Sequence, residues 1–213
     1  VGLVQEDNKS AVFKNMVDSI NLSGKKLTAG DVGYHFLVEA LHEAGASQLL
    51  YDMNARDDVP GYGFQLRRGA TALTESWPAL EEVSNNHLML GHIMEWFYYG
   101  LAGISQSDSS VAYKHVVIKP EVVGDISFVK GSFKSPYGLI SSEWKSTDKR
   151  FELRVNIPAN SGATVFVPAN KESAISVDGK ILKNRKELNP AFLKNNKFEI
   201  RLKSGEYMIV VNN

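Results

Sequence analysis

Residues 60–104 read PGYGFQLRRGATALTESWPALEEVSNNHLMLGHIMEWFYYGLAGI, and this stretch concentrates the chemistry of the chain. It holds two of the three tryptophans and two of the five histidines. Glu75 lies near its centre, and Trp77 follows two residues later, directly before Pro78. Because proline disfavours helical geometry in the residue before it, the sequence predicts an extended or turn conformation at Trp77. A carboxylate beside an aromatic ring is typical of a sugar pocket, in which the ring packs on C–H groups and the carboxylate does acid–base work.

A long apolar run follows from about His87 to Ala102, after the helix-capping cluster Ser84-Asn85-Asn86. Glu95 is the only formally charged residue in residues 88–104, and apolar side chains surround the predicted helix axis instead of forming one stripe. A helix that is apolar all round belongs in a protein interior. The sequence therefore predicts one buried helix over residues 87–102, with His87 at its positive end.

The remainder of the first half reads as short helices joined by glycine-containing loops. Apolar spacing predicts helices over residues 9–22, 32–44 and 47–54, arranged as antiparallel hairpins. These helices are too few to close a helical toroid, so we expect part of a larger all-α domain. His35, Glu39 and His42 share one face of the second helix, but their spacing differs from the HExxH zinc motif. We interpret that face as a polar packing surface and predict no metal and no cofactor.

From Val111 the apolar period changes from helical spacing to alternation, which favours strands. The Asp178-Gly179 and Ser204-Gly205 pairs indicate hairpin turns. Short strands with frequent turns predict an antiparallel β-sandwich. The boundary therefore falls in a Ser/Asp-rich stretch, with a helical unit over residues 1–104 and a β-sandwich over residues 111–213. The strands are expected at residues 115–118, 125–133, 139–144, 150–157, 163–167, 175–177, 180–182, 198–202 and 207–211.

The distribution of charged residues supports the same division and limits the classes of ligand that the protein could bind. Residues 1–104 carry 7 basic and 13 acidic side chains, and residues 105–213 carry 17 and 11. An acidic helical half suits a neutral polyol and argues against nucleic acid, which favours a basic surface. The absence of cysteine excludes disulfides and leaves both a cytoplasmic and a periplasmic or secreted location open. No stretch approaches the roughly 20 apolar residues of a membrane span.

Four motifs in order resemble one enzyme family over nearly the whole chain. GYGFQLRRGATALTESW, NNHLMLGHIMEWFYYGLAGI, YKHVVIKP and SPYGLISSEW are similar to the C-terminal part of bacterial α-L-rhamnosidases of glycoside hydrolase family 78. Upstream, LTAGDVGYHFLVEALHEAG resembles the helix entry of an earlier hairpin in that family. The resemblance implies an α+β multidomain protein: the end of a six-hairpin α/α-toroid catalytic domain, followed by an antiparallel β-sandwich.

The resemblance also implies roles for three residues. Glu75 aligns with the family's general base, and His87 aligns with a histidine that contacts the substrate. Trp77 is expected to wall the sugar pocket, with packing in the core as its alternative. The family's general acid lies upstream of the segment that this chain matches. We therefore expect a C-terminal fragment that is inactive alone, whose partners are a carbohydrate substrate and the remainder of the catalytic domain upstream of Val1.

Other interpretations remain open from the residues themselves. Glu75 also suits a structural carboxylate paired with Arg67 or Arg68, and His87 also suits a helix cap or a polar core position. The whole chain could instead be a non-catalytic carbohydrate-binding or structural β-sandwich module with a helical extension. A third interpretation is another helical-toroid glycosidase, or a phosphorolytic enzyme, that acts on a different sugar.

Overall fold

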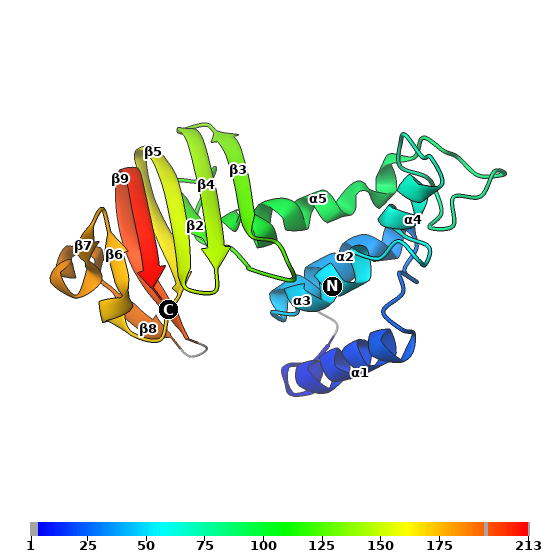
Figure 1. Ribbon diagram of the computed structural model, residues 1–213, viewed down its shortest axis with the longest axis horizontal. Coiled ribbons are helices and arrows are strands. Elements are labelled where there is room, and N and C mark those ends of the chain that lie inside the picture. The colour runs from blue at the N-terminus through cyan, green and yellow to red at the C-terminus, as the bar shows by residue number, and fades with distance from the viewer. Residues whose placement is uncertain (1–3, 194–195, 213) are drawn as a thin grey trace. The chain divides into compact units, whose positions relative to one another are not determined.

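The computed structural model describes residues 4–193 and 196–212 (Figure 1). These residues form two compact units, one that ends at Met94 and one that begins at Glu95. The first unit is helical, and the second is built mainly from a β-sheet. None of the helices in the described ranges is long and apolar enough to span a bilayer.

The helical unit contains three of the predicted helices and one that sequence patterns did not reveal. A 3-10 turn, Glu6–Asn8, leads into α1, and the helices are α1 (Lys9–Leu22), α2 (Asp31–Glu43), α3 (Ser47–Asn54) and α4 (Tyr62–Arg67). The predictions for α1, α2 and α3 are confirmed to within one residue. The six-residue α4 escaped prediction because it is too short to show an apolar period. Buried Tyr34, Val38 and Leu41 give α2 a continuous apolar face.

The predicted single buried helix over residues 87–102 is wrong in both regularity and burial. The segment consists of a 3-10 helix (Leu88–His92), α5 (Ile93–Trp96) and a π-helix (Phe97–Leu101). Changing the number of residues per turn rotates successive side chains away from one common face. Four of the apolar side chains are buried and four are exposed. The buried ones are Leu90, Ile93, Trp96 and Leu101, and the exposed ones are Leu88, Met94, Phe97 and Tyr98.

Within the described residues, nine strands make up the sheet of the second unit. Their order along the hydrogen-bonded path is β1-β2-β5-β9-β6-β7, while β3 and β4 extend from β5 and β8 pairs with β9. Of the strand pairs in the described ranges, β2 with β5 is parallel and the others are antiparallel, which departs from the purely antiparallel prediction. The strands are β1 (Ile104–Gln106), β2 (His115–Ile118), β3 (Phe128–Ser135), β4 (Gly138–Thr147), β5 (Arg150–Pro168), β6 (Ile175–Val177), β7 (Lys180–Ile181), β8 (Ala191–Leu193) and β9 (Lys197–Asn212). The described part of this unit also contains the 3-10 turns Glu172–Ala174, Leu182–Asn184 and Lys186–Leu188.

Two long strands replace four of the predicted short ones. β5 runs through Pro158, where we expected a strand end, and β9 runs through Ser204-Gly205, where we expected a hairpin. The two strands pair along their length, and residues 158–161 of β5 lie opposite Ser204 alone. Pro158 is tolerated because the ladder is irregular there and needs no N–H donor. By contrast, the predicted Asp178-Gly179 turn between β6 and β7 is confirmed, with φ values of 51° and 75°.

The irregularity divides β5 and β9 into two halves that share one hydrophobic core. The first half of β5 pairs with β4 and the second half pairs with β2. Side chains from both regions, such as Trp144, Leu153 and Val165, are fully or almost fully buried in the same cluster. This is the arrangement expected of a β-sandwich formed by bent strands. In Figure 1, β9, β5, β4 and β3 form a layer in this order.

Candidate functional site

Glu75 and His87 lie on two backbone segments that pair with each other. The Glu75 N–H donates to the Ser84 carbonyl at 2.9 Å, and the His87 N–H donates to the Leu73 carbonyl at 2.7 Å. The residues between these segments form the loop that contains Pro78. Twelve positions apart in the sequence, the predicted base and the predicted sugar-contacting histidine are therefore held on neighbouring segments of one unit.

The Glu75 side chain is exposed and is anchored through one oxygen. Its Oε2 accepts a hydrogen bond from the Ser84 N–H at 3.1 Å, so the carboxylate folds back over the paired segment. No ion pair joins Glu75 to Arg67 or Arg68; in the described ranges Arg67 lies instead 3.6 Å from the Asp57 carboxylate. The structure therefore does not support the alternative in which Glu75 forms a salt bridge with Arg67 or Arg68. Among the residues that the structure describes, the carboxylate is held only by this backbone N–H.

His87 faces a carboxylate that the sequence interpretation missed. The imidazole Nε2 lies 3.6 Å from Asp31 Oδ2, and the side chains are 27% and 37% exposed. Nε2 is buried and makes no hydrogen bond within the described part of the chain. Asp31 opens α2, and its Oδ1 accepts a hydrogen bond from the Val32 N–H at 2.9 Å. Asp31 belongs to the quoted LTAGDVGYHF motif, which was the available signal, although nothing in its spacing points to His87.

Trp77 is buried in a cluster of three aromatic rings. Its ring centroid lies 5.0 Å from that of Tyr34 and 5.1 Å from that of Tyr62, both in edge-on geometry. Its Nε1–H donates to the Ala29 carbonyl at 2.7 Å, and only 6% of the residue is exposed. In these contacts Trp77 behaves as a core side chain that ties the Glu75 segment to the residues preceding α2.

Buried polar side chains fix the segment that carries Glu75. Thr74 Oγ1 donates to the Ser76 carbonyl at 2.7 Å, and Gln65 Nε2 donates to the same oxygen at 3.2 Å. Both donors belong to buried residues. Within the aromatic cluster, Tyr62 donates its hydroxyl hydrogen to the Leu90 carbonyl. Burial raises the pKa of Tyr62 well above its ordinary value, so the hydroxyl keeps the proton that it donates.

The histidines of α2 do not form a metal centre in the residues that the structure describes. His35 Nε2 lies 3.8 Å from a Glu39 carboxylate oxygen, and the His35 ring lies 5.1 Å from the ring of His92. No group of three or more His, Cys, Asp or Glu side chains in these ranges has the geometry to hold a metal ion. The polar-face interpretation of this helix is consistent with those contacts.

The chain matches two consecutive domain families. Residues 1–101 match the bacterial alpha-L-rhamnosidase 6 hairpin glycosidase domain, and residues 103–182 match the bacterial alpha-L-rhamnosidase C-terminal domain. Among curated proteins, an alpha-L-rhamnosidase of Formosa agariphila is 26% identical over 209 residues, which is 94% of this chain and 22% of that protein. One from an Alteromonas species is 28% identical over 187 residues, covering 84% of this chain and 20% of that protein.

Solved structures of similar proteins have the same fold over this length. The alpha-L-rhamnosidase from Dictyoglumus thermophilum superposes with a TM-score of 0.88 at 26% identity, covering 99% of this chain and 24% of that one. The Streptomyces avermitilis alpha-L-rhamnosidase complexed with L-rhamnose gives 0.86 at 23% identity, covering 98% and 20%. The chain thus spans about a quarter or less of the proteins that it matches. With a six-hairpin glycosidase match followed by the matching C-terminal domain, the chain belongs to the bacterial α-L-rhamnosidase family as a C-terminal part of it.

Proposed function

We propose that this chain supplies the general-base side of the active site of an inverting glycoside hydrolase. The enzyme removes terminal α-L-rhamnose from glycosides or polysaccharides, with Glu75 as the base and His87 as a ligand of a sugar hydroxyl. The observation that carries the proposal is the pairing of residues 73–75 with residues 84–87, which holds both side chains on neighbouring segments. That pairing lies within the region that matches a glycosidase domain.

The chemistry requires a carboxylate that deprotonates water on one face of the sugar. A carboxylic acid on the other face protonates the leaving oxygen, and the two groups lie about 6.5–9.5 Å apart so that the water fits between base and anomeric carbon. Glu75 suits the base because its carboxylate is exposed and its orientation is set by the Ser84 N–H. A base that is held in place loses less entropy when the water is aligned.

His87 contributes recognition, and Asp31 positions it. An imidazole nitrogen can donate to or accept from a sugar hydroxyl, depending on its tautomer. Asp31, 3.6 Å from Nε2, attracts a proton to that nitrogen and so favours an acceptor at Nδ1. Trp77 fixes the Glu75 segment through the hydrogen bond from its Nε1–H to the Ala29 carbonyl. A wall contact from Trp77 to the sugar would involve only the small exposed part of the ring.

The proposal assigns no general acid to these residues. Asp31 faces His87, and the resemblance identifies the acid with a segment upstream of Val1. We therefore expect the 213-residue chain to hydrolyse no aryl α-L-rhamnoside, and we expect activity when the remainder of the catalytic domain is joined to it. No metal or cofactor enters the mechanism.

The direct test uses the polypeptide of the complete reading frame with an aryl α-L-rhamnoside, and follows the first product by proton NMR. Inversion releases β-L-rhamnose before mutarotation, and the rate does not depend on added phosphate. Release of the α anomer first would refute inversion, and a phosphate requirement would support the phosphorolytic alternative. Binding of rhamnosides without turnover would favour the carbohydrate-binding module.

A further inference from the structure

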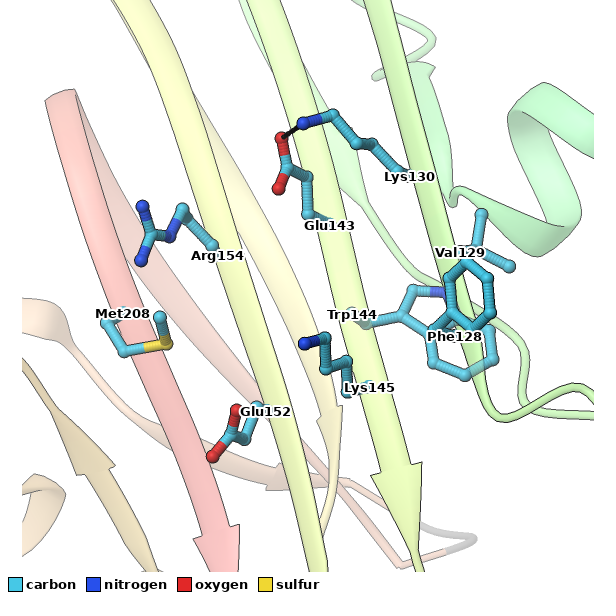
Figure 2. Close-up of a pocket in the computed structure, with 9 residues that line it drawn as sticks. All are labelled: Phe128, Val129, Lys130, Glu143, Trp144, Lys145, Glu152, Arg154 and Met208. Carbon is cyan, nitrogen blue, oxygen red and sulfur yellow. Dashed lines mark ion pairs between the residues drawn. The ribbon is translucent and has the colours of Figure 1, made fainter.

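An open groove crosses the β3, β4, β5 and β9 layer, and its lining contains none of the residues of the proposed active site (Figure 2). Its volume is about 410 Å³, within the range of roughly 300–1,000 Å³ that is usual for small-ligand sites. Nine residues line it: Phe128, Val129, Lys130, Glu143, Trp144, Lys145, Glu152, Arg154 and Met208. All of them belong to the β-sheet unit.

The groove is built from two cross-strand rows. Phe128, Lys145 and Glu152 lie side by side on β3, β4 and β5, and Lys130, Glu143 and Arg154 form the next row. Met208 of β9 ends the second row beside Arg154. Alternation along the strands directs these side chains to the face opposite the core, in which Leu153 and Val155 are fully buried.

Two cations in the groove are not neutralised by the acids beside them. Glu143 pairs with Lys130 at 2.9 Å, and Glu152 pairs with Arg150 at 2.8 Å. Both carboxylates are thus engaged by other partners. Over residues 4–193 and 196–212, the side chains of Lys145 and Arg154 form no ion pair or hydrogen bond, although each lies opposite an acid in register. Figure 2 shows both side chains in the groove, Arg154 toward β9 and Lys145 between β4 and β5.

An exposed aromatic ring accompanies the two cations. Phe128 is 66% exposed at the start of β3, although burying a side chain of its size would stabilise the fold. Aromatic faces pack on the C–H faces of sugar rings, and unpaired guanidinium and ammonium groups bind carboxylates. The paired Glu143 and Glu152 keep lone pairs for sugar hydroxyls. The same acids would repel the dense phosphates of a nucleic acid, and a neutral sugar would leave Lys145 and Arg154 without a counter-charge.

We propose that this groove binds an anionic saccharide that carries carboxylates, with Phe128 on the ring face and Lys145 and Arg154 on a uronate group. The site is non-catalytic and independent of Glu75. It would hold an acidic polysaccharide chain through the C-terminal domain of the enzyme.

The test measures binding of short oligogalacturonates to the 213-residue chain by titration calorimetry. The fully methyl-esterified oligomer serves as a neutral probe of the same shape, and free galacturonate and inorganic sulfate serve as small anions. We expect the acidic oligomer to bind, the esterified oligomer and the small anions to bind at least about tenfold more weakly, and rising salt to weaken the acidic oligomer.

Three substitutions and one control locate the site. Lys145→Gln and Arg154→Gln should each raise the Kd at least about tenfold, since each removes a charge-assisted hydrogen bond, and Phe128→Ala should also weaken binding. Lys134→Gln removes the same charge from an exposed position of β3 outside the groove and should leave the Kd unchanged.

Equal melting temperatures of the variants and the parent chain exclude unfolding as the cause of weaker binding. Equal affinity for the esterified oligomer, equal affinity for sulfate, or no effect of Lys145→Gln and Arg154→Gln would overturn the proposal. The rhamnoside assay does not enter this result, so the two proposals fail separately.

Discussion

At the scale of single residues, the Glu75 site depends more on backbone than on charge. The carboxylate receives the Ser84 N–H, and His87 is held by its own N–H on the Leu73 carbonyl. A sugar ligand that binds such a site competes with few existing side-chain bonds. The contribution of His87 to binding and its contribution to folding can therefore be separated by experiment.

We predict that His87→Ala in the polypeptide of the complete reading frame weakens substrate binding more than it weakens folding. Loss of one hydrogen bond to the substrate should raise KM about two- to tenfold, because a bond of this kind contributes about 0.5–1.5 kcal/mol. The melting temperature should change little, since the backbone bond from residue 87 is retained. Measuring KM and the melting temperature of the same variant shows whether His87 contributes mainly to binding or mainly to folding. Asp31→Asn, which keeps the shape of the positioning residue, should raise KM less, and a large melting loss with unchanged KM would favour the cap interpretation of His87.

Gly103 is the glycine whose replacement should cost most in the second unit. Its φ is +72°, and an added Cβ would lie 2.2 Å from the Pro120 backbone nitrogen. Gly103→Ala should therefore lower the free energy of unfolding by at least about 3 kcal/mol, through strain and collision together. Gly179→Ala is the matched control, because φ is +75° there but the added carbon meets nothing within 4 Å. That control should lose only about 1–2 kcal/mol in chemical denaturation. Equal losses for the two variants would mean that the close approach to Pro120 is absent.

At the scale of elements, helices with one apolar face could be predicted from the sequence better than segments that are apolar all round. The spacing of Val12, Phe13, Met16 and Ile20 was enough to predict α1, because one face carries the apolar residues. The apolar run after His87 gave no such contrast, so its change from 3-10 to π geometry left no trace in the pattern. The strand end predicted at Pro158 was wrong, because the sequence does not distinguish a proline at a ladder irregularity from a proline that ends a strand.

Buried Trp77 allows a test of whether the core holds the Glu75 segment in place. Trp77→Phe removes the Nε1–H bond to Ala29 but keeps an aromatic ring in the cluster. In the polypeptide of the complete reading frame, we predict a stability loss of about 1–3 kcal/mol, because the carbonyl is left without its partner, and a fall in kcat with little change in KM. Trp144→Phe is the control: it removes a 2.7 Å bond from Nε1 to the Leu101 carbonyl in the β-sheet unit. It should cost similar stability without lowering kcat. A fall in kcat for both variants would indicate a general effect of destabilisation.

At the scale of the whole chain, the change of periodicity and the opposite charges of the two halves indicated a helical part followed by a β part. The strands of the second unit confirm that order, and two domain families match on either side of residue 102. The boundary at residues 104–111 remains a prediction, and the compact units divide at Met94. Glu75 and His87 could be named as candidate site residues from the sequence because they stand in contiguous motifs, and their roles remain predictions. Asp31 was not, since only the fold brings it to His87 from 56 positions away.

The role of Glu75 as the base that activates water is tested by the kcat of Glu75→Gln in the polypeptide of the complete reading frame. Glutamine keeps the size of the side chain and an acceptor for the Ser84 N–H, but it cannot take a proton. We predict a loss of about 10²–10⁴-fold in kcat on an aryl α-L-rhamnoside, the usual contribution of general-base catalysis. Glu81→Gln, an exposed acid in the same loop, should keep the parent rate. A Glu75→Gln variant that retains more than about a tenth of the parent kcat, with the Glu81→Gln control unchanged, would contradict the assignment.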